Sequence, residues 1–270
     1  MTSASASMPR VDTHAHIFHR GLTAIATARY VPAYDVALAD YLAFLDAHGI
    51  ARGVLVQPSF LGSDNSHLVE ALQQASGRLA GVAVVEEALP ESQMARLAEA
   101  GIRGLRFNLV GRAPTLIADP AHRPTLRAAE QLGLHVELHA DAPDLLRALA
   151  VLDGFDGPIV VDHFGRPSAT AGELEGLLAL AKDPRIHVKL SAPYRVQRPD
   201  ATSLAPLFVA AFGTERLLWG SDWPWTQFED RVTANAVLPA ALGLTPAMVE
   251  GLDATAMRLF FPGAAQPNAA

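Results

Sequence analysis

The chain has 270 residues and a formal net charge of −7; half of its residues are apolar and 18% are charged. These values describe an ordinary globular protein with enough residues for one sizeable core. The acidic excess argues against sequence-independent binding to nucleic acid or to a membrane, because nothing neutralises the phosphates. The chain has no cysteine, which excludes disulfides and thiol nucleophiles and leaves His and carboxylate side chains to bind any metal.

The first seven residues are small and polar, without the basic start and apolar run of a signal peptide. The apolar stretches elsewhere are short and are interrupted by Gly, Pro or charged residues, so none is expected to span a bilayer. We therefore expect a cytoplasmic protein in which one folded unit, residues 8–262, lies between flexible tails at 1–7 and 263–270.

Short runs rich in β-branched residues alternate along the chain with longer segments of helical periodicity. The predicted strands are Val11–His16, Gly53–Gln57, Leu79–Val85, Gly104–Asn108, His135–His139, Pro158–His163, His187–Leu190 and Leu217–Gly220. The predicted helices are Leu38–His48, Ser66–Ala75, Glu91–Ala100, Thr125–Leu132, Pro143–Val151, Gly172–Ala181, Ser203–Phe212 and Asp230–Leu242.

Strands that alternate with helices indicate a parallel sheet of the α/β class. Eight such units fit the roughly 250 residues of one barrel, so we predict a single-domain (β/α)8 TIM barrel. No Gly-x-Gly-x-x-Gly motif follows the first strand, which counts against a sheet that binds a dinucleotide.

Polar side chains collect at the predicted C-terminal ends of the strands, where barrel enzymes place their active sites. In the first strand, period-2 alternation predicts that Asp12, His14 and His16 share one face. His139, His163 and Asp222 end or follow the fifth, sixth and eighth strands. Each residue alone has an ordinary structural explanation, such as a turn cap or a hydrogen-bonded histidine. Their convergence on one end of the barrel favours an active site.

The motifs around these residues resemble a known family. The sequence Val-Asp-Thr-His-Ala-His from Val11, the His163 of Asp-His-Phe-Gly-Arg-Pro and the Asp222 of Trp-Gly-Ser-Asp-Trp-Pro resemble the amidohydrolase-2 branch of the amidohydrolase superfamily. The run from Arg106 to Arg112 and the Lys189 of Val-Lys-Leu-Ser are similar to the 2-pyrone-4,6-dicarboxylate lactonase and 4-sulfomuconolactone hydrolase group. The resemblance extends over nearly the whole predicted barrel.

This resemblance implies roles for particular residues. Four match the metal-ligand positions of metal-bearing members: His14, His16, His139 and Asp222. His163 matches a histidine that binds or polarises the substrate carbonyl. Three arginines match residues that hold the substrate in the family: Arg106, Arg112 and Arg166. Tyr30 and Arg195 match further substrate contacts. The dicarboxylate lactonases carry a tyrosine in place of His139 and work without metal, so this difference favours a metal-bearing relative.

A divalent metal, zinc first and manganese second, would let these residues hydrolyse an ester ring at neutral pH. Zinc held by imidazoles and a carboxylate lowers the pKa of its bound water to about 7 and polarises a carbonyl. We expect that water to attack a small anionic lactone, such as a muconolactone or a pyrone carboxylate or sulfonate, with Asp222 as general base and His163 stabilising the oxyanion. Arginine forks suit such anions.

Two other functions remain open at this stage. One is metal-dependent, non-oxidative decarboxylation by the same His and Asp set. The other is a barrel that binds metal or ligand without turnover. The sequence also leaves a homo-oligomer open.

Overall fold

The computed structural model describes residues 8–152 and 154–263. The tails expected at 1–7 and 263–270 lie outside these ranges, apart from Gly263. In the described residues one sheet runs in chain order through β1 (Val11–Ala15), β2 (Arg52–Val56), β3 (Leu79–Val84), β4 (Ile102–Asn108), β5 (His135–His139), β6 (Ile159–Val161), β7 (Ile186–Ser191) and β8 (Leu217–Gly220).

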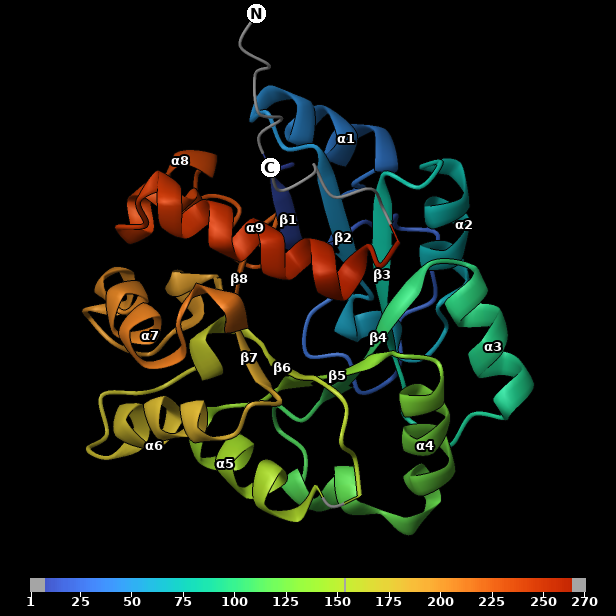
Figure 1. Cartoon of the computed structure of the whole chain (residues 1–270). Helices are drawn as coiled ribbons and strands as arrows, with labels where there is room; N and C mark the ends of the chain where they lie inside the picture. Colours follow the sequence, from blue (N-terminus) through green and yellow to red (C-terminus); the bar gives the residue numbers. More distant parts are fainter. Residues whose placement is uncertain (1–7, 153, 264–270) are drawn as a thin grey trace, which may run out of the picture.

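The sheet closes on itself. Every consecutive pair of strands is parallel. Beyond the ends of β1 and β8, the backbone N–H of His16 donates to Trp223 O at 2.8 Å and that of Asp222 donates to His14 O at 2.8 Å. A parallel bridge joins Ala15 to Trp223 at the same seam. The predicted (β/α)8 barrel is therefore confirmed (Figure 1).

Helices surround the sheet (Figure 1). They are α1 (Leu38–Ala47), α2 (Ser66–Gln74), α3 (Glu91–Glu99), α4 (Arg123–Gln131), α5 (Ala142–Val151), α6 (Glu173–Ala179), α7 (Ala205–Phe212), α8 (Ala234–Val237) and α9 (Pro246–Phe260). The helix predicted over 230–242 is wrong in extent. It is reduced to α8, and a 3₁₀ segment follows from Pro239, which cannot donate the backbone hydrogen bond that a continuous helix needs.

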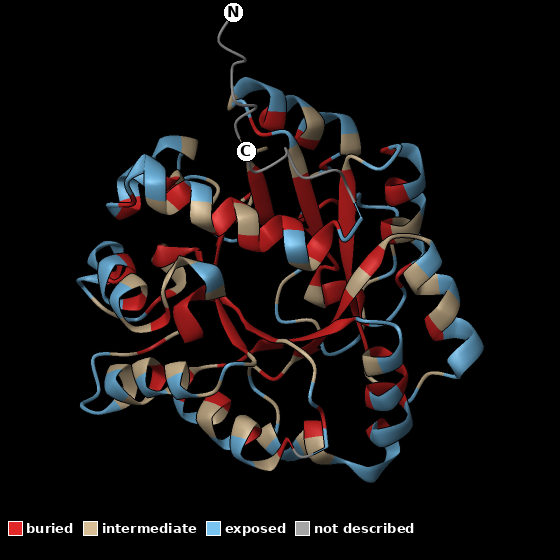
Figure 2. Cartoon of the chain, in the orientation of Figure 1, coloured by how far each residue is buried: buried red, intermediate tan, exposed pale blue. Residues whose placement is uncertain are grey.

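The long helix α9 was not predicted from the sequence, although its start carries clear signals. The Thr245 hydroxyl accepts the N–H of Met248, and Pro246 occupies the first turn, where its missing donor costs nothing. Met257 and Phe260 of this helix pack with Val11, Leu218 and other inward-facing strand residues. In Figure 2 the strands are buried, and α9 carries buried segments among intermediate and exposed ones. Helix α9 thus covers the N-terminal end of the barrel and leaves the C-terminal ends of the strands for the site.

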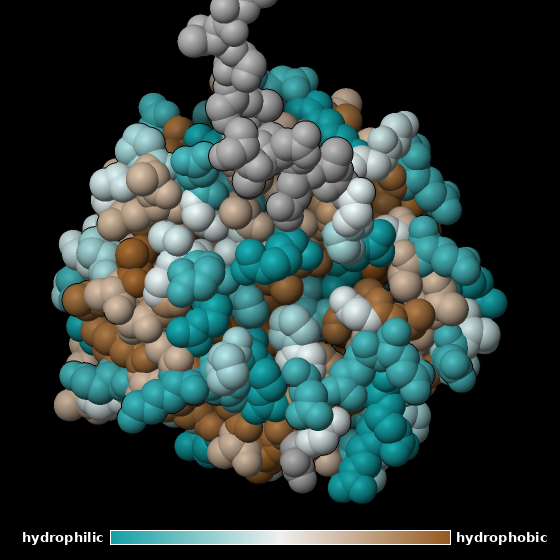
Figure 3. Space-filling view, viewed as in Figure 1, coloured by the Kyte–Doolittle hydropathy of each residue, from teal (hydrophilic) through white to brown (hydrophobic). Residues whose placement is uncertain are grey.

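The molecular surface on the α9 side mixes hydrophilic and hydrophobic residues (Figure 3). The large hydrophobic residues that are exposed, Val31, Leu132 and Leu207, lie on separate elements or loops. Across the described ranges no helix is both long and apolar enough to cross a membrane.

The first strand departs from the predicted alternation. The register between β1 and β2 shifts between Asp12 and Ala15, so Asp12 does not share a face with His14. The Asp12 carboxylate instead accepts hydrogen bonds from Tyr41 of α1 at 3.1 Å and from the Ser221 hydroxyl at 2.6 Å. Burial raises the pKa of Asp12 to about 6, against the lowering effect of these bonds. A bulge of this kind re-aims the side chains that follow it, here the two histidines at the end of β1.

Candidate active site

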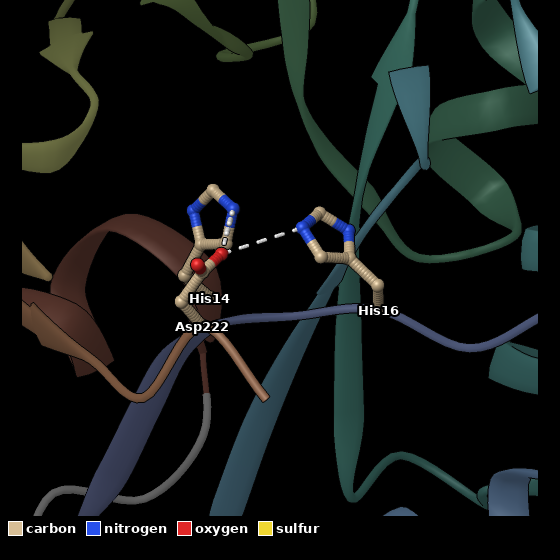
Figure 4. A group of neighbouring side chains, drawn as sticks. All are labelled: His14, His16 and Asp222. Atoms are coloured by element: carbon tan, nitrogen blue, oxygen red, sulfur yellow. Dashed lines mark ion pairs between the residues drawn. The ribbon is translucent and has the colours of Figure 1, made fainter. Parts of the chain in front are cut away.

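Two histidines and an aspartate meet where β1 and β8 end. His14 lies in β1, His16 directly follows it, and Asp222 follows β8. The Oδ1 atom of Asp222 lies 3.6 Å from Nε2 of His14 and 3.6 Å from Nε2 of His16 (Figure 4). All three side chains are buried, and among the described residues neither His14 Nε2 nor Asp222 Oδ1 has a hydrogen-bond partner. Buried polar atoms without partners are costly, so this set fits a divalent metal that takes nitrogen and oxygen ligands.

The other nitrogens of these rings hold them in place. His16 Nδ1 lies 2.7 Å from the carbonyl oxygen of Val56. His14 Nδ1 lies 3.3 Å from Asp162 Oδ1 and 3.3 Å from Lys189 Nζ. Burial and the neighbouring Lys189 ammonium lower the pKa of His14 to about 3, so its ring is neutral at physiological pH. Neutral imidazoles oriented through their second nitrogen are typical of metal ligands.

Asp222 is oriented by donors on its other oxygen. Its backbone has a φ of 56°, a left-handed conformation that turns the chain after β8 and that Asp tolerates better than most residues. The Tyr194 hydroxyl donates to Oδ2 at 2.5 Å and Arg195 Nε donates to it at 2.6 Å. Burial raises the pKa of Asp222, but the Arg195 guanidinium outweighs it and holds that pKa well below its usual range. The side chain is therefore a carboxylate at neutral pH.

Two further histidines line the same end of the barrel. His163 follows β6, its Nε2 lies 3.9 Å from Asp222 Oδ1, and its Nδ1 lies 2.8 Å from the Ser191 hydroxyl. His139 ends β5 and faces His163 edge-on, with ring centroids 5.3 Å apart. Burial lowers the pKa of both rings well below the usual histidine value.

His14, His16 and His163 lie close to Asp222. His139 lies farther from this group. His139 belongs to neither set of donor atoms that lie within 4.8 Å of one another. Its two ring nitrogens are buried and have no hydrogen-bond partner within the described part of the chain. The second such set is His14, Asp162 and His163. It lies beside Lys189 and Arg106, whose charges oppose a cation.

A network of buried charges supports the site from below. Arg106 of β4 contacts Asp162 through Nε at 2.8 Å and Nη2 at 2.7 Å, and Glu137 at 3.5 Å. Lys189 of β7 contacts Glu137 at 2.5 Å and Asp162 at 3.4 Å. Two cations thus balance two carboxylates inside the barrel. Sequence reasoning missed Asp162 and Glu137. Asp162 directly precedes His163, and Glu137 is two residues before His139 on the same strand.

Above the histidines lies a cavity of about 1500 Å³, which the residues expected to bind the substrate also line. They are Tyr30, Arg106, Arg112, Arg166 and Arg195. Each of these arginines already contacts a carboxylate: besides the pairs of Arg106 and Arg195 above, Arg112 pairs with Glu86 at 2.5 Å and Arg166 with Asp141 at 2.8 Å.

Arg29, which sequence reasoning did not single out, lines the cavity next to Tyr30. No ion pair involves it in the described ranges. Burial lowers the pKa of Arg29, and the nearby Arg166 lowers it further. This loop residue lies outside every strand, so periodicity could not identify it.

A (β/α)8 barrel with buried histidines and an aspartate at the C-terminal ends of its strands places this chain among the barrel enzymes. A sequence model of the amidohydrolase-2 family, described as amidohydrolase, matches residues 11–261. The chain belongs to this family and is an amidohydrolase-superfamily hydrolase, as the sequence motifs predicted.

Individual relatives cover most of the chain. It is 31% identical over 248 residues to the 2-pyrone-4,6-dicarboxylate hydrolase of Comamonas testosteroni, an alignment covering 84% of this chain and 81% of that protein. It is 32% identical to the 4-sulfomuconolactone hydrolase of Rhizobium radiobacter, over 81% of this chain and 77% of that protein. A crystal structure from Pseudomonas putida, described as a 2-pyrone-4,6-dicarboxylic acid hydrolase, superposes with a TM-score of 0.85 at 40% identity, covering 94% and 97% of the two chains.

Proposed function

We propose that the protein is a metal-dependent hydrolase of a small anionic lactone, such as a muconolactone or a pyrone that carries carboxylate or sulfonate groups. One observation carries this proposal: His14 Nε2 and Asp222 Oδ1, which have no hydrogen-bond partner among the described residues, lie under a cavity lined by arginines. The named relatives at about 30% identity are hydrolases of a pyrone dicarboxylate and of a sulfonated muconolactone, and both rings are anionic cyclic esters.

In this proposal His14, His16 and Asp222 hold the metal, and His139 completes the set. Three nitrogens and one oxygen suit zinc, with manganese as the second choice. When bound, the cation supplies Lewis acidity, which lowers the pKa of a water and polarises a carbonyl. The oxygen of Asp222 that faces the histidines, Oδ1, also accepts the proton of the attacking water and returns it to the leaving ring oxygen.

His163 stabilises the negative charge that develops on the carbonyl oxygen. When the Ser191 hydroxyl donates to Nδ1 of His163, the ring proton resides on Nε2, which faces Asp222 and the cavity. A neutral imidazole with that tautomer donates a hydrogen bond to the substrate oxygen. The low pKa of His163 favours this neutral form.

The substrate's acidic groups meet the arginines of the cavity wall, Arg106, Arg112 and Arg166, with Tyr30 beside them. We add Arg29 to this set. A guanidinium that already contacts a carboxylate must share its donors with a second anion, whereas Arg29 lines the cavity without an ion pair to any described carboxylate.

The test is to purify the chain without a His-tag, measure bound metal, and screen the zinc- and manganese-loaded forms against lactones with one or two acidic groups. We expect about one metal per chain, acid release from an anionic lactone, loss of activity with a chelator and recovery when metal is returned. A metal-free preparation that is fully active and indifferent to chelator would contradict the metal-dependent mechanism. Release of carbon dioxide would instead support the decarboxylase alternative.

A further inference from the structure

The side chains of Tyr194 and Arg195 converge on a single oxygen of Asp222. Both donate to Oδ2, at 2.5 Å from the Tyr194 hydroxyl and 2.6 Å from Arg195 Nε. The other oxygen, Oδ1, receives no hydrogen bond from any described residue and faces the Nε2 atoms of His14 and His16 at 3.6 Å. The carboxylate is therefore divided into an oxygen held by the protein and an oxygen presented to the site.

The two donors are themselves held rigidly. Ala192, just after β7, adopts a left-handed φ of 47° that turns the chain into the short 3₁₀ segment Pro193–Arg195. Arg195 Nη2 donates to the Thr226 carbonyl at 2.9 Å, in the loop after β8. Its guanidinium also lies over two aromatic rings, 5.4 Å from the Tyr194 centroid and 5.3 Å from that of Phe228. An arginine fixed by a carboxylate, a carbonyl and two rings has little freedom to follow a substrate.

We propose that Tyr194 and Arg195 form a carboxylate clamp: together they lock the rotation of the Asp222 side chain so that only Oδ1 reaches the metal. Tyr194 is then a positioning residue, and Arg195 acts through Asp222 rather than on the substrate, where the family resemblance placed it. This inference rests on the metal-dependent function proposed above. Without the clamp, the carboxylate can turn about its terminal bond, exchange its oxygens and spend part of its time with neither oxygen correctly aimed.

Removal of an outer partner of a metal ligand typically weakens metal binding by about 10- to 100-fold. We therefore expect Tyr194→Phe to weaken zinc binding within that range, measured by competition with a chromophoric chelator, while the circular dichroism spectrum is unchanged. Arg195→Gln is expected to do the same. The matched control is Tyr34→Phe, which also removes a tyrosine-to-carboxylate hydrogen bond, from Tyr34 to Glu229 at 2.5 Å, but does not touch Asp222. Its zinc affinity should equal that of the wild type.

Steady-state kinetics provide a second readout. If Arg195 acts through Asp222, Arg195→Gln lowers kcat equally for an acidic lactone and for its neutral methyl ester and leaves the ratio of their KM values unchanged. If Arg195 binds the substrate anion, the same variant raises KM for the acidic lactone alone, and the clamp is refuted. Zinc affinity in Tyr194→Phe equal to that of the wild type refutes it as well, while leaving the proposed function intact. A wild-type chain that binds neither zinc nor manganese overturns both.

Discussion

Lys189→Met is the most informative perturbation of the charged network under the site. The Lys189 ammonium is fully buried and contacts Glu137 at 2.5 Å and Asp162 at 3.4 Å. Methionine has a similar length but no charge, so Arg106 remains as the only cation of the network that faces the two carboxylates. Breaking a buried ion pair by removing one partner costs about 3–5 kcal/mol, because it leaves an uncompensated charge. For a chain of this size that corresponds to a fall in Tm of about 6–10 °C.

The matched comparison is the double variant Lys189→Met with Glu137→Gln, which restores one cation to one carboxylate. Residues in direct contact have coupling free energies of about 0.5–3 kcal/mol, so the double variant should be less destabilised than the sum of the two single changes. The assay is thermal and urea unfolding followed by circular dichroism, with chelator present throughout so that metal does not enter the comparison. A loss below about 1 kcal/mol for Lys189→Met, or strict additivity in the double variant, would refute the argument.

Four further outcomes are expected. Asp222→Asn should fold normally yet lose nearly all turnover, because an amide cannot accept the proton; a variant that keeps a tenth of the wild-type kcat would remove Asp222 from that role. His139→Tyr should lower both the zinc content found by elemental analysis and the rate, and unchanged content would show that His139 is not a ligand. Arg29→Ala should cost about 1.5–3 kcal/mol, or about 10- to 150-fold in kcat/KM, for an acidic lactone, whereas an equal loss on its methyl ester would contradict anion recognition. Burial raises the pKa of Asp253 from 3.8 to about 7. The folded state therefore binds this proton more tightly than the unfolded chain, and stability should fall as pH rises between those values. Asp253→Asn should flatten this slope, as measured by urea midpoints at pH 4 and pH 8, and an unaltered slope would exclude Asp253 as its source.

The architecture could be predicted because, along most of the chain, the hydrophobic periodicity of each segment and its length indicate the same element, strand or helix. The strands His135–His139 and Leu217–Gly220 have the bounds expected from the sequence. Strand β6 is shorter than predicted, because Asp162 and His163 leave the sheet at its active-site end. Helix α9 comes in addition to the eight strand–helix units that account for the barrel, so barrel periodicity does not predict it, although Thr245 and Pro246 carry the signals of a helix start.

The site could be predicted only in part. Sequence motifs and strand alternation indicate which end of the barrel a side chain occupies, but they do not indicate which charged side chains pair with one another. They placed His14, His16 and Asp222 at one end of the barrel, where the structure has them within contact of one another. They could not show that Arg106 and Arg195 are already engaged by carboxylates, since those partners, Asp162 and Asp222, come from strands distant in sequence. Charge pairing of this kind depends on side-chain positions across the barrel interior, which no local pattern encodes.

The seam between β1 and β8 has a consequence for assembly. His14 and His16 come from the first strand and Asp222 from the segment after the last, so the three donors meet only when the ring of strands is complete. A chain arrested with β1 and β8 apart has His14 and His16 without the Asp222 carboxylate. Metal that binds only the closed ring stabilises it by mass action, by about 2.7 kcal/mol when its free concentration is 100 times the dissociation constant. If the chain binds metal as proposed, metal uptake during refolding is a direct signal of barrel closure, readable before any substrate is known.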